Sequence, residues 1–319
     1  MTKKSPSVSI IMPTFEIDKS EEALRYIFKQ DYPIKEIIVV NDNPKSKPSK
    51  SMLNFMKLNK IKLINNPKNL GIARSLNEGI TASKADVIIV LCRDHFPEGN
   101  NWIRHIIEKL SSDKKIGAVV CPFVWPTNAW GKYSFLTKLF TFRHIAVPKY
   151  GGVYYKKEVF DKIGLFNSQK YAFAGEDCDM LNRLKNAGYT FEHIEDRVMH
   201  VHYDKNSNFL GSLKKEYRYG GAHGTLKREY GLLKRIGLFD FEIRLLFIAG
   251  FFIGLFTNLW LSLFCVLPFF LAALTQAISA FGKTKWLPGL LLYPFVGIGI
   301  LLIQTAGAIE GFVKGKQDK

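Results

Sequence analysis

The stretch Val8-Ser9-Ile10-Ile11-Met12-Pro13-Thr14-Phe15 is a run of β-branched and apolar residues that ends in proline and threonine. This pattern predicts a short buried strand followed by a loop. Similar runs follow at 36–40, 61–64, 86–91 and 117–121. Segments with helical periodicity separate them, at 21–30, 51–58, 72–81 and 102–110. Such alternation predicts an α/β fold with a mostly parallel central sheet flanked by helices.

Polar side chains follow three of these strands, at Pro13–Glu16, Asn41–Pro44 and Cys92–His95. Ligands of parallel sheets bind at the carboxyl ends of the strands, which makes these clusters candidate site residues. Asn41 and Asp42 suit hydrogen bonding to a nucleobase edge, and Asp94 suits Mg²⁺ or Mn²⁺ held against phosphates. Each cluster alone also fits an ordinary turn. The first strand leads into neither a Walker A nor a GxGxxG sequence, so phosphates need other ligands.

The C-terminal part of the chain is much more apolar. Leu245–Phe281 and Trp286–Ile309 are almost continuously apolar, and about 20 such residues cross a bilayer. The second stretch predicts one membrane-spanning helix, and the first predicts one long helix or two tightly turned ones. With two membrane spans the basic tail returns to the cytoplasm, whereas with three spans Lys283 and Lys285 lie in the cytoplasm instead. We favour two spans. The alternative is that these segments are core helices of a soluble domain.

The 319-residue chain carries a net charge of +17 and 47% hydrophobic residues, which excludes a disordered chain. Basic residues concentrate before the first apolar stretch, at Lys214, Lys215, Arg218, Lys227, Arg228, Lys234 and Arg235. The positive-inside rule therefore predicts a multi-pass protein of the cell membrane with its large domain in the cytoplasm. The same residues suit anionic headgroups. We expect no nucleic-acid partner, because no base-reading motif accompanies this charge.

Four segments together resemble the family-2 glycosyltransferases with the GT-A fold, in order and in spacing, over about residues 7–205. They are Val8–Phe15, Glu36–Asp42, Asn69–Ile80 and Gly175–Asp177. Each motif alone is weak, whereas four in register are specific. The resemblance implies an inverting transferase that moves a sugar from a nucleotide-diphosphate donor, usually with Mg²⁺ or Mn²⁺. The apolar C-terminus is similar to that of membrane-anchored members.

The resemblance also implies roles for the donor site. Residues expected to bind the nucleotide are Pro13, Thr14, Phe15, Asn41, Asp42, Asn69, Gly71 and Arg74. Glycine at position 71 permits close backbone approach, and Arg74 offers a partner for phosphate. The alternative for Asn69, Gly71 and Arg74 is that they form an ordinary helix start, with Asn69 as the helix cap and Arg74 in solvent.

For the metal, the resemblance implies Asp94 together with His200 or His202, which follow the extended run Arg197–Val201. Which histidine reaches the metal or the diphosphate stays open. The family motif commonly reads Asp-x-Asp where this chain has Cys92-Arg93-Asp94. Because one acid is missing, a modest metal affinity is expected and metal independence is conceivable.

Gly175-Glu176-Asp177 opens a predicted helix that ends near Gly188. Asp177 falls on the same face as Leu181 and Leu184, whereas Glu176 and Asp179 are expected to be surface acids that complement the helix dipole. The resemblance implies that Asp177 is the general base and that Gly152 and Glu176 lie on the acceptor side. The alternative for Asp177 is a helix cap.

These expectations divide the chain into a catalytic domain (1–205), basic interfacial helices (206–244), a transmembrane region (245–310) and a basic tail (311–319). The aromatic stretch Trp125–His144 is either a membrane-resting loop or a packing segment. The expected activity is sugar transfer to a lipid-linked or other membrane-near glycan acceptor with a free hydroxyl. Two alternatives remain, a non-catalytic sugar-nucleotide-binding scaffold and a polyprenyl-phosphate glycosyltransferase.

Overall fold

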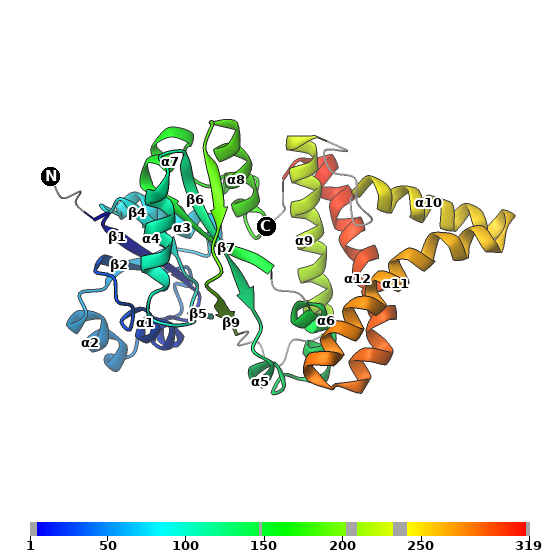
Figure 1. The fold of residues 1–319 in the computed structure, drawn as a ribbon, viewed down its shortest axis with the longest axis horizontal. Helices are drawn as coiled ribbons and strands as arrows, with labels where there is room; N and C mark the ends of the chain where they lie inside the picture. Colours follow the sequence, from blue (N-terminus) through cyan, green and yellow to red (C-terminus); the bar gives the residue numbers. More distant parts are fainter. Residues whose placement is uncertain (1–4, 147–148, 202–208, 232–240, 317–319) are drawn as a thin grey trace. The chain divides into compact units, whose positions relative to one another are not determined.

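The computed structural model describes residues 5–146, 149–201, 209–231 and 241–316. They form two compact units (Figure 1). The first comprises residues 5–124 and 149–201, and the second comprises residues 125–146, 209–231 and 241–316. Residues 125–146, expected within the catalytic domain, are therefore part of the helical second unit.

The first unit contains a mixed sheet in the order β3-β2-β1-β4-β7-β6-β9-β5, with β8 paired to β6. Its strands are β1 (Val8–Thr14), β2 (Ile34–Asn41), β3 (Lys62–Asn65), β4 (Val87–Val90), β5 (His95–Pro97), β6 (Ile116–Val124), β7 (Lys149–Lys156), β8 (Thr190–His193) and β9 (Val198–His200). Strands β3, β2, β1 and β4 are parallel, and β7 is antiparallel to β4 and β6. All five predicted strands are confirmed. The β-branched side chains of β1, β2, β4 and β6 are largely buried on both faces, whereas β3, at the end of the sheet, is only partly buried.

Helices cover both faces of this sheet. They are η1 (Ile17–Ser20), α1 (Glu21–Ile27), α2 (Lys50–Leu58), α3 (Ile72–Ala82), α4 (Trp102–Ser112), α7 (Lys157–Ile163) and α8 (Glu176–Asn186). Apolar residues of α3, α7 and α8 share one core with Ile11, Ile38 and Tyr155 of the sheet. On the other face Trp102 of α4 packs edge-on against Tyr154, with ring centroids 5.1 Å apart. Alternate strand residues thus enter opposite cores.

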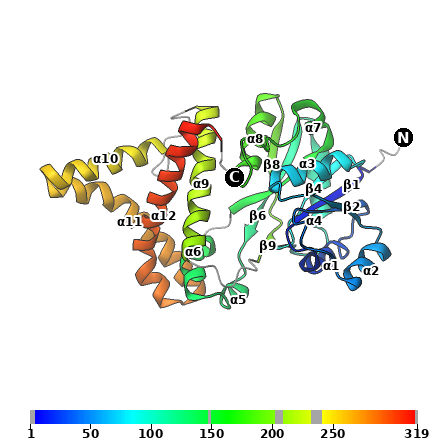
Figure 2. The ribbon, with the colours of Figure 1, turned by 180° about the vertical axis from the view of Figure 1, so that it is seen from behind.

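The second unit is helical, and its helices are α5 (Thr127–Trp130), α6 (Phe135–Ala146), α9 (Phe209–Tyr230), α10 (Phe241–Thr257), α11 (Leu259–Thr284) and α12 (Leu287–Lys314). Figure 2 shows α9 alongside α12. The two backbones are close, since a Cβ on Gly224 would stand 1.9 Å from the carbonyl oxygen of Ala308. Helices α5 and α6 pack on α11 and α12 through Trp130, Phe142, Ala277 and Tyr293. Trp125–His144 is therefore a packing segment.

The apolar stretch Leu245–Phe281 forms two helices, α10 and α11, which meet at Asn258. The Asn258 side chain accepts a hydrogen bond from the backbone N–H of Trp260 and caps α11. Among the described residues, α11 (26 residues, mean hydropathy 2.1) and α12 (28 residues, 1.9) are long and apolar enough to cross a membrane. Much of their surface is apolar and exposed in the structure, as expected for helices that contact lipid.

Candidate active site

Loops from neighbouring strands meet at the carboxyl edge of the sheet. The backbone N–H of Asp42 donates to the carbonyl of Thr14 over 2.8 Å, which joins the ends of β2 and β1. The Asn43 side chain donates to the carbonyl of Phe15 over 3.1 Å. Pro13 and Thr14 are buried, whereas Phe15 is 49% exposed. Phe15 is therefore accessible to a ligand at this edge, and its contact with a nucleobase stays a prediction.

Asp42 organises the loop that precedes α3. Its Oδ1 accepts from the backbone N–H of Leu70 over 2.8 Å, and its Oδ2 accepts from that of Gly71 over 2.9 Å. Oδ1 also accepts from the Asn66 side chain over 2.8 Å. The carboxylate thus holds backbone groups of residues 70–71 at the sheet edge, where the ribose and diphosphate were expected.

Three other residues predicted to bind the nucleotide, Asn41, Asn69 and Arg74, have partners within the protein. The Asn41 amide donates to the carbonyl of Ser46 (2.9 Å) and to the side-chain oxygen of Asn65 (3.0 Å). Arg74 is exposed on α3 and pairs with Glu78 at 2.9 Å. This is the solvated arginine of the alternative interpretation, and a role for Arg74 at the phosphates stays a prediction. Asn69 accepts from the backbone N–H of Gly71 over 3.1 Å, which shapes the turn before α3.

Asp94 and His200 are brought together by a strand pair that the sequence did not predict. Strand β5 runs antiparallel to β9, with His95 opposite His200. His200 Nε2 lies 3.3 Å from Asp94 Oδ2. The His200 ring also lies 5.5 Å from the Phe123 ring, and the His95 ring lies 4.3 Å from it, which fixes both imidazoles. His202 lies outside the described residues.

The donor set at this point fits a divalent cation of the Mg²⁺ or Mn²⁺ type. A carboxylate from Asp94 and an imidazole from His200 converge, and diphosphate oxygens would complete the coordination. Cys92 also lies within ligand distance of Asp94 and His95, but burial raises the pKa of its thiol, which disfavours the thiolate. His95 Nδ1 accepts from the Cys92 backbone N–H over 3.3 Å. His95 therefore serves better to orient the loop than to bind metal.

Glu176 and Asp177 open α8 as a pair of desolvated carboxyl groups. Burial, then the charge of Asp177, raises the pKa of Glu176 to about 8. Burial also raises the pKa of Asp177. Within the described part of the chain, neither Glu176 Oε2 nor the buried Tyr155 hydroxyl has a hydrogen-bond partner. The Tyr155 pKa is raised by burial first, and then by these two carboxylates. Polar atoms left unpaired in this way are available to a ligand.

The prediction that Glu176 and Asp179 are surface acids is wrong. Glu176 has a fully buried carboxyl oxygen, and Asp179 is only 2% exposed. Asp179 turns inward because Arg183, one turn later, pairs with it at 2.9 Å. The Arg183 guanidinium also donates to the carbonyls of Ile163 and Leu165, which ties α8 to the segment after α7.

Gly152, expected on the acceptor side, lies in β7 opposite Cys121 of β6. A Cβ at this position would stand 2.3 Å from the Tyr154 hydroxyl and 2.6 Å from Cys121 Sγ, so only glycine fits. The structure gives Gly152 a packing role, and its place at an acceptor stays a prediction.

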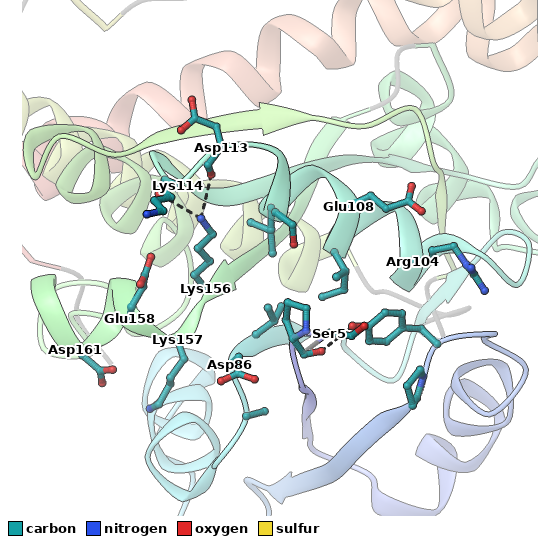
Figure 3. A pocket seen from close by; sticks show the side chains of 18 of the residues that line it. Ser5, Asp86, Arg104, Glu108, Asp113, Lys114, Lys156, Lys157, Glu158 and Asp161 are labelled. Atoms are coloured by element: carbon teal, nitrogen blue, oxygen red, sulfur yellow. Dashed lines mark hydrogen bonds between the residues drawn. The ribbon is translucent and has the colours of Figure 1, made fainter. Parts of the chain in front are cut away.

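A hollow of about 1120 Å³ lies at the opposite edge of the same sheet, near the starts of β1 and β4 (Figure 3). Its lining carries charges of both signs, and the lysines are engaged with backbone carbonyls. Lys156 donates to those of Asp113 and Lys114, and Lys157 donates to that of Ile80. The hollow has none of the converging donors found around Asp94, so the carboxyl edge is the candidate active site.

Sequence reasoning included Glu16 and His95 in the polar clusters after the strands but gave them no role, and it missed Phe123. Arg93, directly before Asp94, forms an ion pair with Glu16 of the loop after β1. The signal for Glu16 and His95 was their position directly after strands that end at the same edge. Phe123 gave no signal, because it continues an apolar strand.

The chain is similar in sequence and in fold to known glycosyltransferases. The sequence profile "Glycosyl transferase family 2" matches residues 9–164. Two poly-beta-1,6-N-acetyl-D-glucosamine synthases of Staphylococcus epidermidis are 28% identical over 104 residues, which is 33% of this chain. The matched segment spans only 25% of the length of these relatives.

Two solved structures share the fold. Mannosyltransferase PcManGT from Pyrobaculum calidifontis, in complex with GDP-Man and Mn²⁺, superposes with a TM-score of 0.61 at 18% identity, over 98% of this chain and 88% of that one. GalNAc-T7 with UDP, GalNAc and Mn²⁺ superposes with a TM-score of 0.51 at 14% identity, over 73% and 53%. The GT-A-like fold predicted from the sequence is confirmed, and residues 9–164 are a glycosyl transferase family 2 domain.

Proposed function

We propose that this chain is an inverting glycosyltransferase that moves a sugar from a nucleoside-diphosphate donor to a membrane-associated acceptor. The observation that carries the proposal is the convergence of Asp94 and His200, 3.3 Å apart, at the carboxyl edge of a family 2 domain. The Mn²⁺ in the two similar structures supports a divalent metal at this point. The choice between Mg²⁺ and Mn²⁺ is left to experiment.

The residues have distinct tasks in the proposed reaction. Asp94 and His200 hold the cation, which when bound offsets the charge of the leaving diphosphate. Asp42 accepts hydrogen bonds from the backbone N–H groups of Leu70 and Gly71 and so holds the shape of the loop beside the donor. Asp177 takes the proton from the attacking hydroxyl. Glu176, whose pKa is about 8, keeps its proton at neutral pH and donates a hydrogen bond from the acceptor side.

The acceptor is proposed to be a lipid-linked glycan hydroxyl, presented at the cytoplasmic face of the cell membrane. The apolar exposed surfaces of α11 and α12 and the basic residues of α9 support a multi-pass membrane location. A polyprenyl phosphate is the second candidate acceptor. The desolvated carboxyl pair favours the hydroxyl, because an ionised phosphate needs no base.

The test is release of nucleoside diphosphate by the purified full-length chain, supplied with GDP- and UDP-sugars, Mn²⁺ and a lipid-linked glycan extract. We expect stoichiometric release and glycosylated lipid, both lost in Asp94→Ala. Donor binding without release under every acceptor condition would favour the non-catalytic scaffold instead.

A further inference from the structure

We propose that Arg93 binds the diphosphate of the donor and that Glu16 holds the arginine in place until the donor arrives. This inference rests on the proposed function, because it names the group that recognises the diphosphate in that site. It assigns a donor-binding role to two residues that lie in the polar clusters after β1 and β4 and had no role of their own in the sequence analysis.

The fold places the two residues between the expected nucleoside and metal positions. Strands β1 and β4 are hydrogen-bonded parallel neighbours, so their carboxyl-end loops lie side by side. Glu16 follows β1, directly after Phe15, and Arg93 follows β4, directly before Asp94. The ion pair between Arg93 and Glu16 spans these loops. A diphosphate that connects a nucleoside at Phe15 to a cation at Asp94 has to pass this pair.

The chemistry of the pair suits an exchange of partners. A guanidinium binds phosphate through two parallel hydrogen bonds. Its present partner is the Glu16 carboxylate, which accepts from one of these donors, Nη1. The Arg93 side chain is 19% exposed and the Glu16 side chain 42%, so the anion is reached from solvent while the cation is sheltered. An incoming diphosphate can therefore replace the carboxylate on Arg93 without moving a buried group.

Glu16 does not lose its only cation in this exchange. Lys19 Nζ lies 2.6 Å from Glu16 Oε1, whereas Arg93 contacts Oε2. After release from Arg93 the carboxylate keeps the lysine, which limits the cost of separating the pair. The loop is also anchored, since the Thr14 hydroxyl donates to the Glu16 carbonyl over 3.1 Å. Only the side chain has to move.

The exchange also addresses the missing acid of Cys92-Arg93-Asp94. A site with one carboxylate leaves more of the diphosphate charge to be offset by protein cations than a site with two. Arg93 stands next to that single carboxylate, whereas Arg74, the arginine first expected to do this, pairs with Glu78 on the exposed side of α3.

The experiment measures binding of GDP and UDP, with Mn²⁺, to the full-length protein in detergent by isothermal titration calorimetry. The matching nucleosides are titrated in parallel. Arg93→Gln should weaken nucleoside diphosphate binding at least tenfold and leave nucleoside binding within twofold. Glu16→Gln should strengthen diphosphate binding about threefold or more, because the competing anion is gone. The double variant should behave as Arg93→Gln, since Glu16 acts only through Arg93.

Arg104→Gln is the matched control, because it removes an exposed arginine that pairs with an acidic residue, Asp31, at 3.0 Å. Arg104 and Asp31 both line the hollow at the opposite edge of the sheet. It should change neither affinity. Equal diphosphate binding by wild type and Arg93→Gln, or weaker binding by Glu16→Gln, overturns the inference. If wild type binds no nucleoside diphosphate at all, the proposed function fails with it. If Arg93→Gln does not fold, Glu16→Gln still tests the inference. A purely structural role of Glu16 would not lead to tighter diphosphate binding when Glu16 is replaced.

Discussion

His200 Nε2 lies 3.3 Å from Asp94 Oδ2, although 106 residues separate the two in the chain. The antiparallel pairing of β5 and β9 brings them together, with His95 opposite His200. A carboxylate and an imidazole placed in this way would supply two of the roughly six ligands that a Mg²⁺ or Mn²⁺ ion takes. The rest is open to phosphate oxygens.

Asp94→Ala should lower turnover at least about 100-fold, because the cation would lose its carboxylate ligand and the leaving diphosphate its neutralising charge. EDTA should do the same to the wild type, and Mn²⁺ should restore activity. His200→Ala should raise the Mn²⁺ concentration needed for half-maximal rate. Activity assays across a Mn²⁺ titration provide the check, and full activity in EDTA would contradict the metal assignment.

The pairing of β5 with β9, which brings Asp94 and His200 together, could not be predicted from the sequence patterns. Strands β1, β2 and β4 were predictable because their runs of β-branched residues are buried on both faces. Strands β5 and β9 have three residues each, too few to show a period, and the pairing of β9 with both β5 and β6 joins segments far apart in the chain. Only the extended run before His200 was predicted. The contacts of Asp94 with His200 and of Arg93 with Glu16 depend on the tertiary structure and leave no local pattern in the sequence.

Gly71→Ala should destabilise the first unit by about 2 to 5 kcal/mol, since it combines left-handed strain with a steric clash. Gly71 has φ +88°, and a Cβ would stand 2.5 Å from the carbonyl oxygen of Ala172. Gly164→Ala is the matched control, because Gly164 has φ +81° with nothing within 4 Å of the added Cβ. Thermal unfolding should show a small loss for Gly164→Ala and a larger one for Gly71→Ala. Equal losses would mean that the Ala172 loop yields.

The start of α8 shows where helical periodicity misleads. The spacing of apolar residues predicted that Asp177 faces the protein interior and that Glu176 and Asp179 face solvent. The structure buries Asp179 because Arg183 neutralises it, an interaction between polar residues that a pattern of apolar ones ignores. Glu176 is desolvated because the first turn of the helix abuts the sheet residue Tyr155 rather than solvent.

Phe256→Asp combined with Trp260→Asp should weaken membrane association. The two side chains are 88% and 78% exposed at the turn between α10 and α11, inside a stretch without charged residues from 245 to 282. A charge placed in the apolar region costs about 2.5 kcal/mol or more. Flotation with vesicles of anionic phospholipid measures the loss. Leu58→Asp, at an 82% exposed apolar residue of α2 in the first unit, should float like wild type.

Glu176→Gln should remove a pH dependence of stability. The pKa of a free glutamate side chain is 4.5, and that of Glu176 in the folded protein is about 8. Between these two pH values the folded state therefore holds a proton that the unfolded state has released. Stability is therefore fully present below about pH 4.5 and falls as pH rises toward 8, by about 1.4 kcal/mol per unit of pKa shift. Melting temperatures from pH 5 to 8.5 should fall less steeply in Glu176→Gln. Glu158→Gln, on an exposed residue of α7, should keep the wild-type slope.

Asp177→Asn should lower kcat by at least about 100-fold while donor affinity stays within a few-fold. A positioned carboxylate contributes typically 10²–10⁴-fold when a hydroxyl must shed its proton, and asparagine keeps the shape without the base. Because burial raises the pKa of Asp177, the wild-type rate should rise with pH as this group ionises, and the variant should lack that limb. Steady-state kinetics over pH, with donor affinity measured by calorimetry, separate the outcomes. A near-normal kcat would point to an ionised phosphate acceptor, and a loss confined to donor binding would move Asp177 into the nucleotide site.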